Sequence, residues 1–338
     1  MASIPHLGAF RHGGRLREAM AAYPDVREPW LDLSTGINPE PWPGARAPDR
    51  ALRSLPDPSA LAELEAVAGR AFGVADPRRV VAVGGADIAL RLLPLLLNEG
   101  GVALVAPIYG GHVEAWAGRK PQMVATMDER RAAEADVLVL VNPNNPDGRQ
   151  VGRDALAALA AARSARGRWT IVDEAFGETA PHLTVADLAI ERLVVLRSFG
   201  KFYGLPGARL GFVICGNLLA QQFRVVLGDW PVCADALALG LGAYADEAWR
   251  ATTAACLATQ ARNVDAVLSA AGLGVVGGCD LFRWVETSDA HRLFAGLCAQ
   301  GVLTRPFAEH PTRLRFGIPA RDNLERLRRA LQAVRHAA

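Results

Sequence analysis

The 338-residue chain lacks the features that most directly reveal a compartment or a bound metal. It has only five cysteines, at positions 215, 233, 256, 279 and 298, and no two of them form a Cys-x-x-Cys pair. An odd number of scattered cysteines argues against a disulfide framework and fits reduced thiols in the cytoplasm. The cysteines form no cluster with histidine either, so the sequence predicts no bound metal.

A strong charge bias and a long apolar run are also missing. The net charge is only +2, with both signs interspersed, so there is no basic stripe that would predict nucleic acid binding. The most hydrophobic stretch, residues 80–107, is broken by Asp87, Arg91, Asn98 and Glu99 and is not expected to cross a bilayer. The first 20 residues carry charges but no apolar centre, so they do not resemble a signal peptide. We expect a soluble protein that binds neither nucleic acid nor a membrane.

Short apolar runs of strand length alternate with amphipathic segments rich in alanine and leucine. The expected strands cover residues 80–83, 102–105, 137–141, 169–172, 193–196 and 212–214. Helical patterns lie between several of them, at residues 88–97, 112–117 and 153–163. This alternation predicts an α/β fold with a mostly parallel central sheet that is covered by helices.

The pattern changes after about residue 225. A long helical region over residues 233–271 precedes strand candidates at 281–285, 302–304 and 314–316 and helices at 289–300 and from 321. We therefore expect three parts: an N-terminal arm (1–45) that contributes to a small domain, a large α/β domain (46–225) and a small α+β C-terminal domain (226–338).

In α/β sheets, ligands bind at the carboxyl ends of the strands, so the residues that follow each strand are the most informative. Residues 84–87 read Gly-Gly-Ala-Asp and open a helix, where backbone N–H groups can close on a phosphate. A simple tight turn is the alternative. Residues 107–110 read Pro-Ile-Tyr-Gly and place Tyr109 at a strand end, either in the core or facing a ligand.

Two further strand ends carry polar motifs. Residues 142–148 read Asn-Pro-Asn-Asn-Pro-Asp-Gly, a rigid turn that directs an amide side chain outward. Residues 173–176 read Asp-Glu-Ala-Phe, and Asp173 ends a buried strand. An unpaired carboxylate there would cost several kcal/mol, so Asp173 needs a partner, either a helix N-terminus or a cation of a ligand.

The last of these strands leads into residues 198–201, Ser-Phe-Gly-Lys, and an arginine follows at Arg209. A lysine in a glycine-rich loop between a serine and an arginine suits an amine that forms a Schiff base beside a phosphate. Taken alone, such a lysine is more often simply solvated.

In this order, the motifs resemble the fold-type I pyridoxal 5'-phosphate (PLP) enzymes. More narrowly, they resemble the class I and II aminotransferases close to histidinol-phosphate aminotransferase, over nearly the whole chain. The resemblance implies that Lys201 holds PLP as a Schiff base and moves protons at the substrate Cα. It also implies that Asp173 pairs with the pyridinium nitrogen, that Asn145 donates to the ring O3′ and that Tyr109 stacks on the ring.

The same resemblance implies a phosphate site for the cofactor formed by Gly85, Ala86, Ser198 and Arg209. Phe176 would lie beside the cofactor, at a position where many aminotransferases carry a tyrosine that also donates to O3′. The loss of that donor leaves the asparagine of the turn as the main partner of O3′.

The two ends of the chain resemble the threonine-phosphate decarboxylase branch, which serves cobalamin biosynthesis. The similar segments are residues 12–14 (His-Gly-Gly), 31–39 (Leu-Asp-Leu-Ser-Thr-Gly-Ile-Asn-Pro) and 314–319 (Leu-Arg-Phe-Gly-Ile-Pro). The resemblance implies that Arg315 binds the substrate carboxylate and Arg305 the substrate phosphate. The other implied substrate contacts are His12, Gly36, Ile37 and Asn38. The alternatives are solvated arginines at strand ends and an arm histidine without a role.

The resemblance therefore implies a cytoplasmic homodimer that decarboxylates L-threonine O-3-phosphate to (R)-1-amino-2-propanol O-2-phosphate. An aminotransferase for histidinol phosphate or a related amino acid is the alternative. Phe176, the His-Gly-Gly arm and Leu55, which replaces a tyrosine common in the histidinol-phosphate enzymes, argue against it. A non-catalytic PLP-fold subunit is a third reading, and the presence of Lys201, Asp173 and Asn145 argues against that.

Overall fold

The computed structural model describes residues 10, 12–97 and 100–336, and residues 1–9 and 11 of the expected arm lie outside these. The chain forms two compact units. The small unit contains the described part of Met1–Glu40 together with Pro146–Gly148 and Thr252–Ala338, and the large unit contains Pro41–Asn145 and Arg149–Ala251. Among the described residues, no helix combines the length and apolar character needed to cross a membrane.

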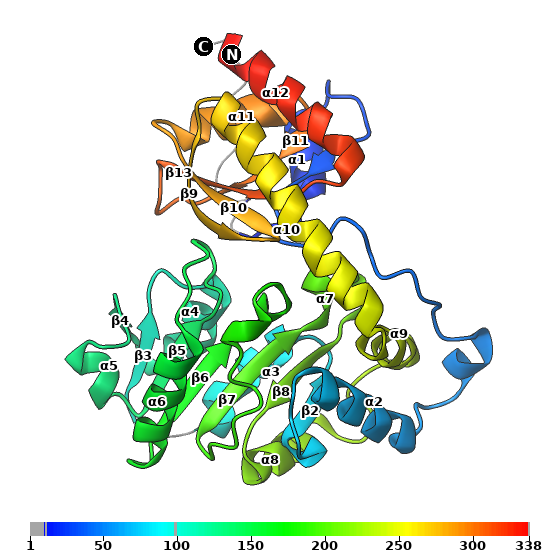
Figure 1. The fold of residues 1–338 in the computed structure, drawn as a ribbon, viewed down its shortest axis with the longest axis vertical. Coiled ribbons are helices and arrows are strands. Elements are labelled where there is room, and N and C mark those ends of the chain that lie inside the picture. The colour runs from blue at the N-terminus through cyan, green and yellow to red at the C-terminus, as the bar shows by residue number, and fades with distance from the viewer. Residues whose placement is uncertain (1–9, 11, 98–99, 337–338) are drawn as a thin grey trace. The chain divides into compact units, whose positions relative to one another are not determined.

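The large unit is built on a seven-stranded sheet with the order β2-β8-β7-β6-β5-β3-β4 (Figure 1). Its strands are β2 (Val80–Val83), β3 (Val102–Val105), β4 (Gln122–Val124), β5 (Val137–Val141), β6 (Trp169–Asp173), β7 (Leu193–Ser198) and β8 (Gly211–Ile214). Neighbouring strands are parallel except that β8 runs antiparallel to both β2 and β7. The expected α/β class and its mostly parallel sheet are confirmed.

The strands of this sheet read as continuous apolar runs because helices cover both faces. The helices of the large unit are α2 (Pro58–Ala71), α3 (Ala86–Leu96), α4 (Gly110–Trp116), α5 (Arg130–Glu134), α6 (Arg153–Ser164), α7 (Phe199–Phe202), α8 (Asn217–Leu227) and α9 (Ala234–Ala245). One face packs against α3, α4 and α8, with Leu93, Trp116 and Phe223 in the core. The strand residues on that face include Val194 and Leu196.

Short 3₁₀ turns connect several of these elements. They are η2 (Asp49–Arg53), η3 (Pro77–Arg79), η4 (Ala117–Arg119), η5 (Gly177–Thr179), η6 (Pro181–Leu183), η7 (Pro206–Ala208) and, in the small unit, η8 (Arg321–Asn323). The turns η5, η6 and η7 follow β6 or β7, so they shape the chain at the carboxyl ends of these strands.

The long helical region expected over residues 233–271 is two helices, α9 and α10 (Glu247–Ala270). Asp246 separates them: its carboxylate accepts hydrogen bonds from the backbone N–H of Trp249 (3.0 Å) and from the indole of Trp42 (3.1 Å). Because α9 packs against α2, the large unit extends to Ala251, not to about residue 225. On the N-terminal side, the segment that belongs to the small unit ends at Glu40, five residues before the expected boundary at 45.

The small unit contains a four-stranded antiparallel sheet and a two-stranded parallel pair. The sheet has the order β12 (Arg305–Pro306), β13 (Arg313–Gly317), β10 (Phe282–Glu286), β9 (Gly274–Cys279), and the pair is β1 (Leu31–Asp32) with β11 (Val302–Leu303). The helices are α1 (Leu16–Ala22), α10, α11 (Ala290–Ala299) and α12 (Leu324–His336). Phe10 and Leu33 join Phe294 and Phe316 in one core, which fixes the N-terminal segment within this unit.

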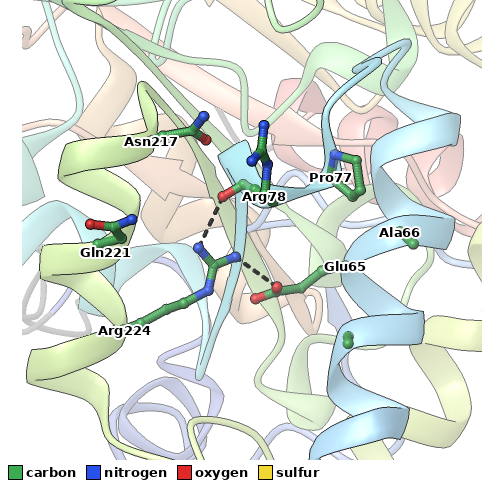
Figure 2. A pocket seen from close by; sticks show the side chains of 8 residues that line it. Glu65, Ala66, Pro77, Arg78, Asn217, Gln221 and Arg224 are labelled. Carbon is green, nitrogen blue, oxygen red and sulfur yellow. Dashed lines mark hydrogen bonds and ion pairs between the residues drawn. The ribbon is translucent and has the colours of Figure 1, made fainter.

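Two side chains cover the open edge of the large sheet at β2 (Figure 2). Glu65 accepts a hydrogen bond from the Ala82 N–H (3.0 Å), and Arg224 donates to the carbonyl of Val80 (2.8 Å). Arg224 also donates to Glu65 (2.8 Å) and to the carbonyl of Arg78 (2.9 Å), the two contacts drawn in the figure. Edge strands leave backbone groups unpaired, and this pair satisfies them.

A hollow of about 500 Å³ lies beside this pair. It is lined by Ala62, Glu65, Ala66, Pro77, Arg78, Asn217, Gln221 and Arg224. It lies near the start of β2, whereas the Gly84-Gly85 turn follows the end of that strand. Glu65 and Arg224 already bind the backbone of the edge strand, so the hollow is not a candidate for the functional site.

We predict that Glu65→Ala lowers the free energy of unfolding by about 1–3 kcal/mol, because the Ala82 N–H and the Arg224 guanidinium lose their shared acceptor. Urea unfolding followed by circular dichroism measures this. Arg78→Ala is the matched control, since its side chain lines the same hollow but is exposed. Equal midpoints for the two variants would contradict the role given to Glu65.

Candidate functional site

The predicted cofactor residues of the large unit follow β2, β3, β5, β6 and β7. These five strands run in the same direction. The strands β3, β5, β6 and β7 are parallel, and β2 has the direction of β7 because β8, which lies between them, is antiparallel to both. Their carboxyl ends therefore lie at one edge of the sheet, and the structure brings the predicted residues of this unit to that edge.

The glycine turn and Arg209 form a site suited to an anion. Gly85 has φ +101°, a value that favours glycine, and α3 begins at the next residue. A Cβ built on Gly85 would lie 2.5 Å from Nη2 of Arg209, so the guanidinium lies directly against the turn. The Ala86 nitrogen is equally close to Gly211, where a Cβ would lie 2.4 Å away. A helix N-terminus with an arginine beside it favours a phosphate.

Asp87 does not compete with this anion site. Its carboxylate accepts a hydrogen bond from Arg91, one turn further along α3, at 2.8 Å. The acidic side chain therefore has a cationic partner of its own on the helix, and the negative charge also suits the first turn of that helix.

The carboxylate of Asp173 has two partners inside the protein. Oδ2 lies 3.0 Å from Nε2 of His112, and Oδ1 accepts a hydrogen bond from the Ala175 N–H at 2.9 Å. Asp173 is 6% exposed and His112 is fully buried. The aspartate is thus held rigidly at the end of β6.

His112 is a residue that the sequence analysis missed. It lies in the first turn of α4, three residues after Tyr109, and the two rings make an edge contact at 6.2 Å. The only signal in the sequence is the Tyr-x-x-His spacing at a helix start, which is also ordinary for a core histidine. Its pairing with Asp173 joins positions 61 residues apart, and no local pattern encodes that contact.

The three asparagines of the turn after β5 differ in their contacts and in their exposure. Asn142 exchanges hydrogen bonds with the backbone of Val151 (2.9 and 3.0 Å), and Asn144 donates to the carbonyl of Pro107 (2.9 Å). Both are 1% exposed, whereas Asn145 is only partly buried. Asn142 and Asn144 therefore hold the turn, and Asn145 is the most exposed of the three asparagines.

Tyr109 and Phe176 supply rings at neighbouring strand ends. Tyr109 caps the start of α4 and is partly buried, and this burial raises the pKa of its hydroxyl. The hydroxyl therefore stays protonated at neutral pH. Phe176 is almost fully buried at the start of η5 and offers no hydroxyl at this position.

Lys201 lies in α7, directly after β7, and Ser198 is the residue that caps this helix. The side chain of Lys201 is partly buried. Gly200 lets the chain fold back at this point, because a Cβ there would lie 2.6 Å from the Cα of Pro206. The chain contains only two lysines, and the other, Lys120, is exposed. A Schiff base to a lysine side chain can therefore form at only two positions, Lys120 and Lys201.

The small unit contains the second group of predicted residues. Arg305 in β12 and Arg315 in β13 are directly opposite each other across the antiparallel pair. The guanidinium of Arg315 donates to the carbonyl of Ser34 (3.1 Å) and lies over Phe282, and that of Arg305 lies over Phe307. Guanidinium groups bind carboxylate and phosphate oxygens with two N–H donors at once, so two opposed arginines suit a ligand with two anionic groups.

The N-terminal segment joins this second group through Ser34. The Gly14 N–H donates to the Ser34 hydroxyl (2.8 Å), and a Cβ on Gly13 would lie 2.4 Å from the Ser34 carbonyl oxygen. His12, which is partly buried, is the residue just before them. Arg315 and the His-Gly-Gly segment therefore meet at the same serine.

The remaining predicted substrate residues follow Ser34 along the chain. Gly36 and Asn38 are buried and Ile37 is partly buried. The Asn38 side chain accepts a hydrogen bond from the Glu40 N–H at 3.0 Å, which is a local turn contact. The structure thus places all six predicted substrate residues in the small unit and the predicted cofactor residues in the large unit.

Comparison with known proteins gives consistent results. The model of the family "Aminotransferase class I and II" matches residues 30–334. The chain is 39% identical to a threonine-phosphate decarboxylase of Sinorhizobium sp (91% of this chain, 92% of the relative). It is 36% identical to a threonine-phosphate decarboxylase of Pseudomonas aeruginosa (91% of this chain, 93% of the relative). A solved histidinol-phosphate aminotransferase from Sinorhizobium meliloti in complex with pyridoxal-5'-phosphate has the same fold, with TM-score 0.82 at 20% identity, covering 100% of this chain and 99% of that one.

We predict an energetic coupling between His112 and Asp173. A double-mutant cycle of His112→Phe and Asp173→Ala should give a coupling of about 1–3 kcal/mol in the free energy of unfolding, since each single change leaves a buried polar partner unpaired. The midpoints come from urea unfolding of the cofactor-free protein. Additive effects of the two changes would show that the pair does not interact.

Proposed function

Because the chain belongs to the class I and II aminotransferase family, we propose that it is a PLP-dependent decarboxylase of L-threonine O-3-phosphate. The product is (R)-1-amino-2-propanol O-2-phosphate, an intermediate for cobalamin biosynthesis. The observation that carries this proposal is the identity of 36–39% to two threonine-phosphate decarboxylases over 91% of the chain. The proposal includes a cytoplasmic homodimer, by analogy with the family.

The residues at the edge of the large sheet fit PLP. Arg209, Ser198 and the N–H groups of Gly85 and Ala86 would hold the cofactor phosphate at the start of α3, where the Arg209 guanidinium already lies against the Gly85 turn. Asp173 would keep a proton on the pyridine nitrogen, and this needs a buried, fixed carboxylate. When bound, PLP draws electrons from the bonds at the substrate Cα.

Three side chains complete the cofactor contacts. Asn145 would donate to the ring O3′, and Tyr109 would pack on the face of the ring. Phe176 would add an apolar contact but no second donor to O3′. Lys201 would bind the cofactor through its amine and then act on the proton at the substrate Cα.

The substrate carries two anionic groups, and the opposed arginines of the small unit match them. Arg315 would bind the carboxylate and Arg305 the phosphate, with His12 as a further contact to the phosphate. Gly36, Ile37 and Asn38 would line the substrate side. By holding the carboxylate in one place, Arg315 would favour cleavage of the bond between Cα and the carboxylate over loss of the Cα proton, and so decarboxylation over transamination.

The proposed reaction breaks the bond between Cα and the carboxylate, whose carbon leaves as CO₂. A proton takes its place on Cα, and Lys201 is the residue assigned to deliver it. No keto acid is consumed, in contrast to transamination. This difference in co-substrate separates the two candidate functions experimentally.

An aminotransferase acting on histidinol phosphate remains the second candidate because it would use the same cofactor residues. The likeness to the solved histidinol-phosphate aminotransferase is at the level of the fold, at 20% identity. Phe176 and the exposed Leu55 both stand where those enzymes commonly carry a tyrosine. These two departures favour the decarboxylase.

Product analysis tests the proposed decarboxylation directly. The PLP-loaded protein, incubated with L-threonine O-3-phosphate and no keto acid, should release CO₂ and aminopropanol phosphate in equal amounts, and Lys201→Ala should release neither. Absence of both products, together with glutamate formation from histidinol phosphate and 2-oxoglutarate, would establish the alternative. Borohydride reduction should fix the cofactor on the peptide that contains Lys201, and Lys120 is the internal control.

Substitution of Arg315 tests the proposed carboxylate site. Arg315→Ala should raise the KM for L-threonine O-3-phosphate by about tenfold or more, equivalent to the roughly 1.5–3 kcal/mol of a charge-assisted hydrogen bond. Arg313→Ala is the matched control on the same strand, because Arg313 pairs with Glu286 and has no assigned substrate contact. An unchanged KM for Arg315→Ala would remove this residue from the site.

A further inference from the structure

Arg197 is a buried arginine that the proposed reaction does not use. It is 5% exposed, and its guanidinium is held by two glutamates: Nη1 donates to Glu174 at 2.8 Å and Nη2 lies 3.0 Å from Glu178. The face of the guanidinium lies over the ring of Phe72 at 4.7 Å. Both glutamate side chains are also buried, so three charges are taken out of water at one place.

The position of this cluster along the strands is specific. Glu174 directly follows Asp173 at the end of β6, and Arg197 directly precedes Ser198 at the end of β7. The two strands are in parallel register, with Asp173 opposite Leu196, and the Glu174 N–H donates to the Leu196 carbonyl (2.9 Å). The ion pair between Glu174 and Arg197 therefore bridges the two strands where the cofactor residues begin.

Side chains alternate along a strand, so Arg197 and Leu196 point to opposite faces of the sheet. Leu196 packs with α3 and α8, and Arg197 packs on Phe72, the residue that follows α2. Ser198 shares the face of Leu196. The charged cluster thus lies on the opposite face from the side chain of Ser198.

The cluster also fixes the turn that follows Asp173. Glu174 accepts hydrogen bonds from the Thr184 hydroxyl (2.6 Å) and the Val185 N–H (2.8 Å), and its carbonyl accepts from the Gly177 N–H (2.8 Å). A Cβ on Gly177 would lie 2.6 Å from Nη1 of Arg197, so only glycine leaves room for the guanidinium.

Aromatic packing connects the same cluster to the helix that carries Lys201. Phe72 packs edge-on against Tyr244 (5.2 Å), and Tyr244 contacts Phe199 (5.7 Å) and Tyr203 (4.9 Å). Phe199 is the first residue of α7, and Tyr203 follows its last. A continuous chain of ring contacts thus leads from the Arg197 guanidinium through Phe72 and Tyr244 to both ends of α7.

From this arrangement we infer that Arg197, with Glu174 and Glu178, is a positioning cluster that sets the placement of Asp173 relative to Lys201. The inference rests on the proposed function in one respect, that PLP binds at these two residues. Buried ion pairs contribute little net stability compared with apolar packing, so a purely stabilising role does not explain three buried charges at this place. A planar guanidinium that binds two carboxylates fixes distances that a lysine ammonium does not.

The test uses Arg197→Lys and the milder Gly177→Ala, which keeps every charge but intrudes on the guanidinium. Arg224→Lys is the matched control, since Arg224 also binds a buried glutamate of the large unit but lies at the edge strand β2. Each PLP-loaded variant is titrated with acid and base while the absorbance band of the bound cofactor is recorded. The dissociation constant of PLP, kcat and KM complete the measurements.

If the cluster positions the two residues, Arg197→Lys and Gly177→Ala will shift the midpoint of the cofactor titration and weaken PLP binding. The kcat should fall about 10- to 100-fold, as for a misplacement of reacting groups by about 1 Å, with little change in KM. Arg224→Lys should leave all cofactor measurements at the wild-type values.

Lower unfolding midpoints with an unchanged cofactor titration and unchanged PLP affinity would overturn the inference and leave a structural role. Should Arg197→Lys not fold, Gly177→Ala decides alone by the same measurements. The cofactor titration requires no substrate. A wild-type protein that binds PLP but releases no CO₂ would therefore count against the proposed reaction and not against the positioning cluster.

Discussion

The organisation of the large unit depends on one constraint, the burial of its central strands on both faces. Such strands are apolar along their length, so polar side chains are confined to their ends. At one edge, the ends of β5, β6 and β7 lead to Asn145, Asp173 and Lys201. The positions of these residues follow from the register of the strands, and the sheet is therefore the rigid frame on which the proposed chemistry rests.

Several charged side chains at the ends of these strands are paired with charged or polar groups of the protein. Asp173 is paired with His112, Asp87 with Arg91, and Arg197 with two glutamates, so the acids near the strand ends have partners within the protein. The arginines assigned to anions lie in two places. Arg209 lies against a glycine turn, and Arg305 and Arg315 face each other across a strand pair. Sites of this kind gain most from a ligand with separate anionic groups, as the proposed cofactor and substrate have.

Much of the fold could be predicted because it is written in local patterns. The six expected strands of the large sheet are present, since short runs of valine and leucine that are bounded by turn residues favour buried strands. The helical region predicted over 233–271 is present as two helices, because the Asp246 carboxylate caps a new helix within it. The expected boundary near residue 225 was displaced to Ala251 because α9 packs on α2, and a change in composition does not reveal which partner a helix will choose.

The sequence by itself determined the class of fold, the order of the motifs and the residue types that suit PLP, because each depends on neighbours within a few positions. The tertiary structure alone decided which partners meet. The contacts of His112 with Asp173 and of Arg197 with Glu174 join residues 61 and 23 positions apart. The opposition of Arg305 and Arg315 depends on the register of two strands. Such contacts are set by packing between elements, and a linear pattern carries no distance information at that range.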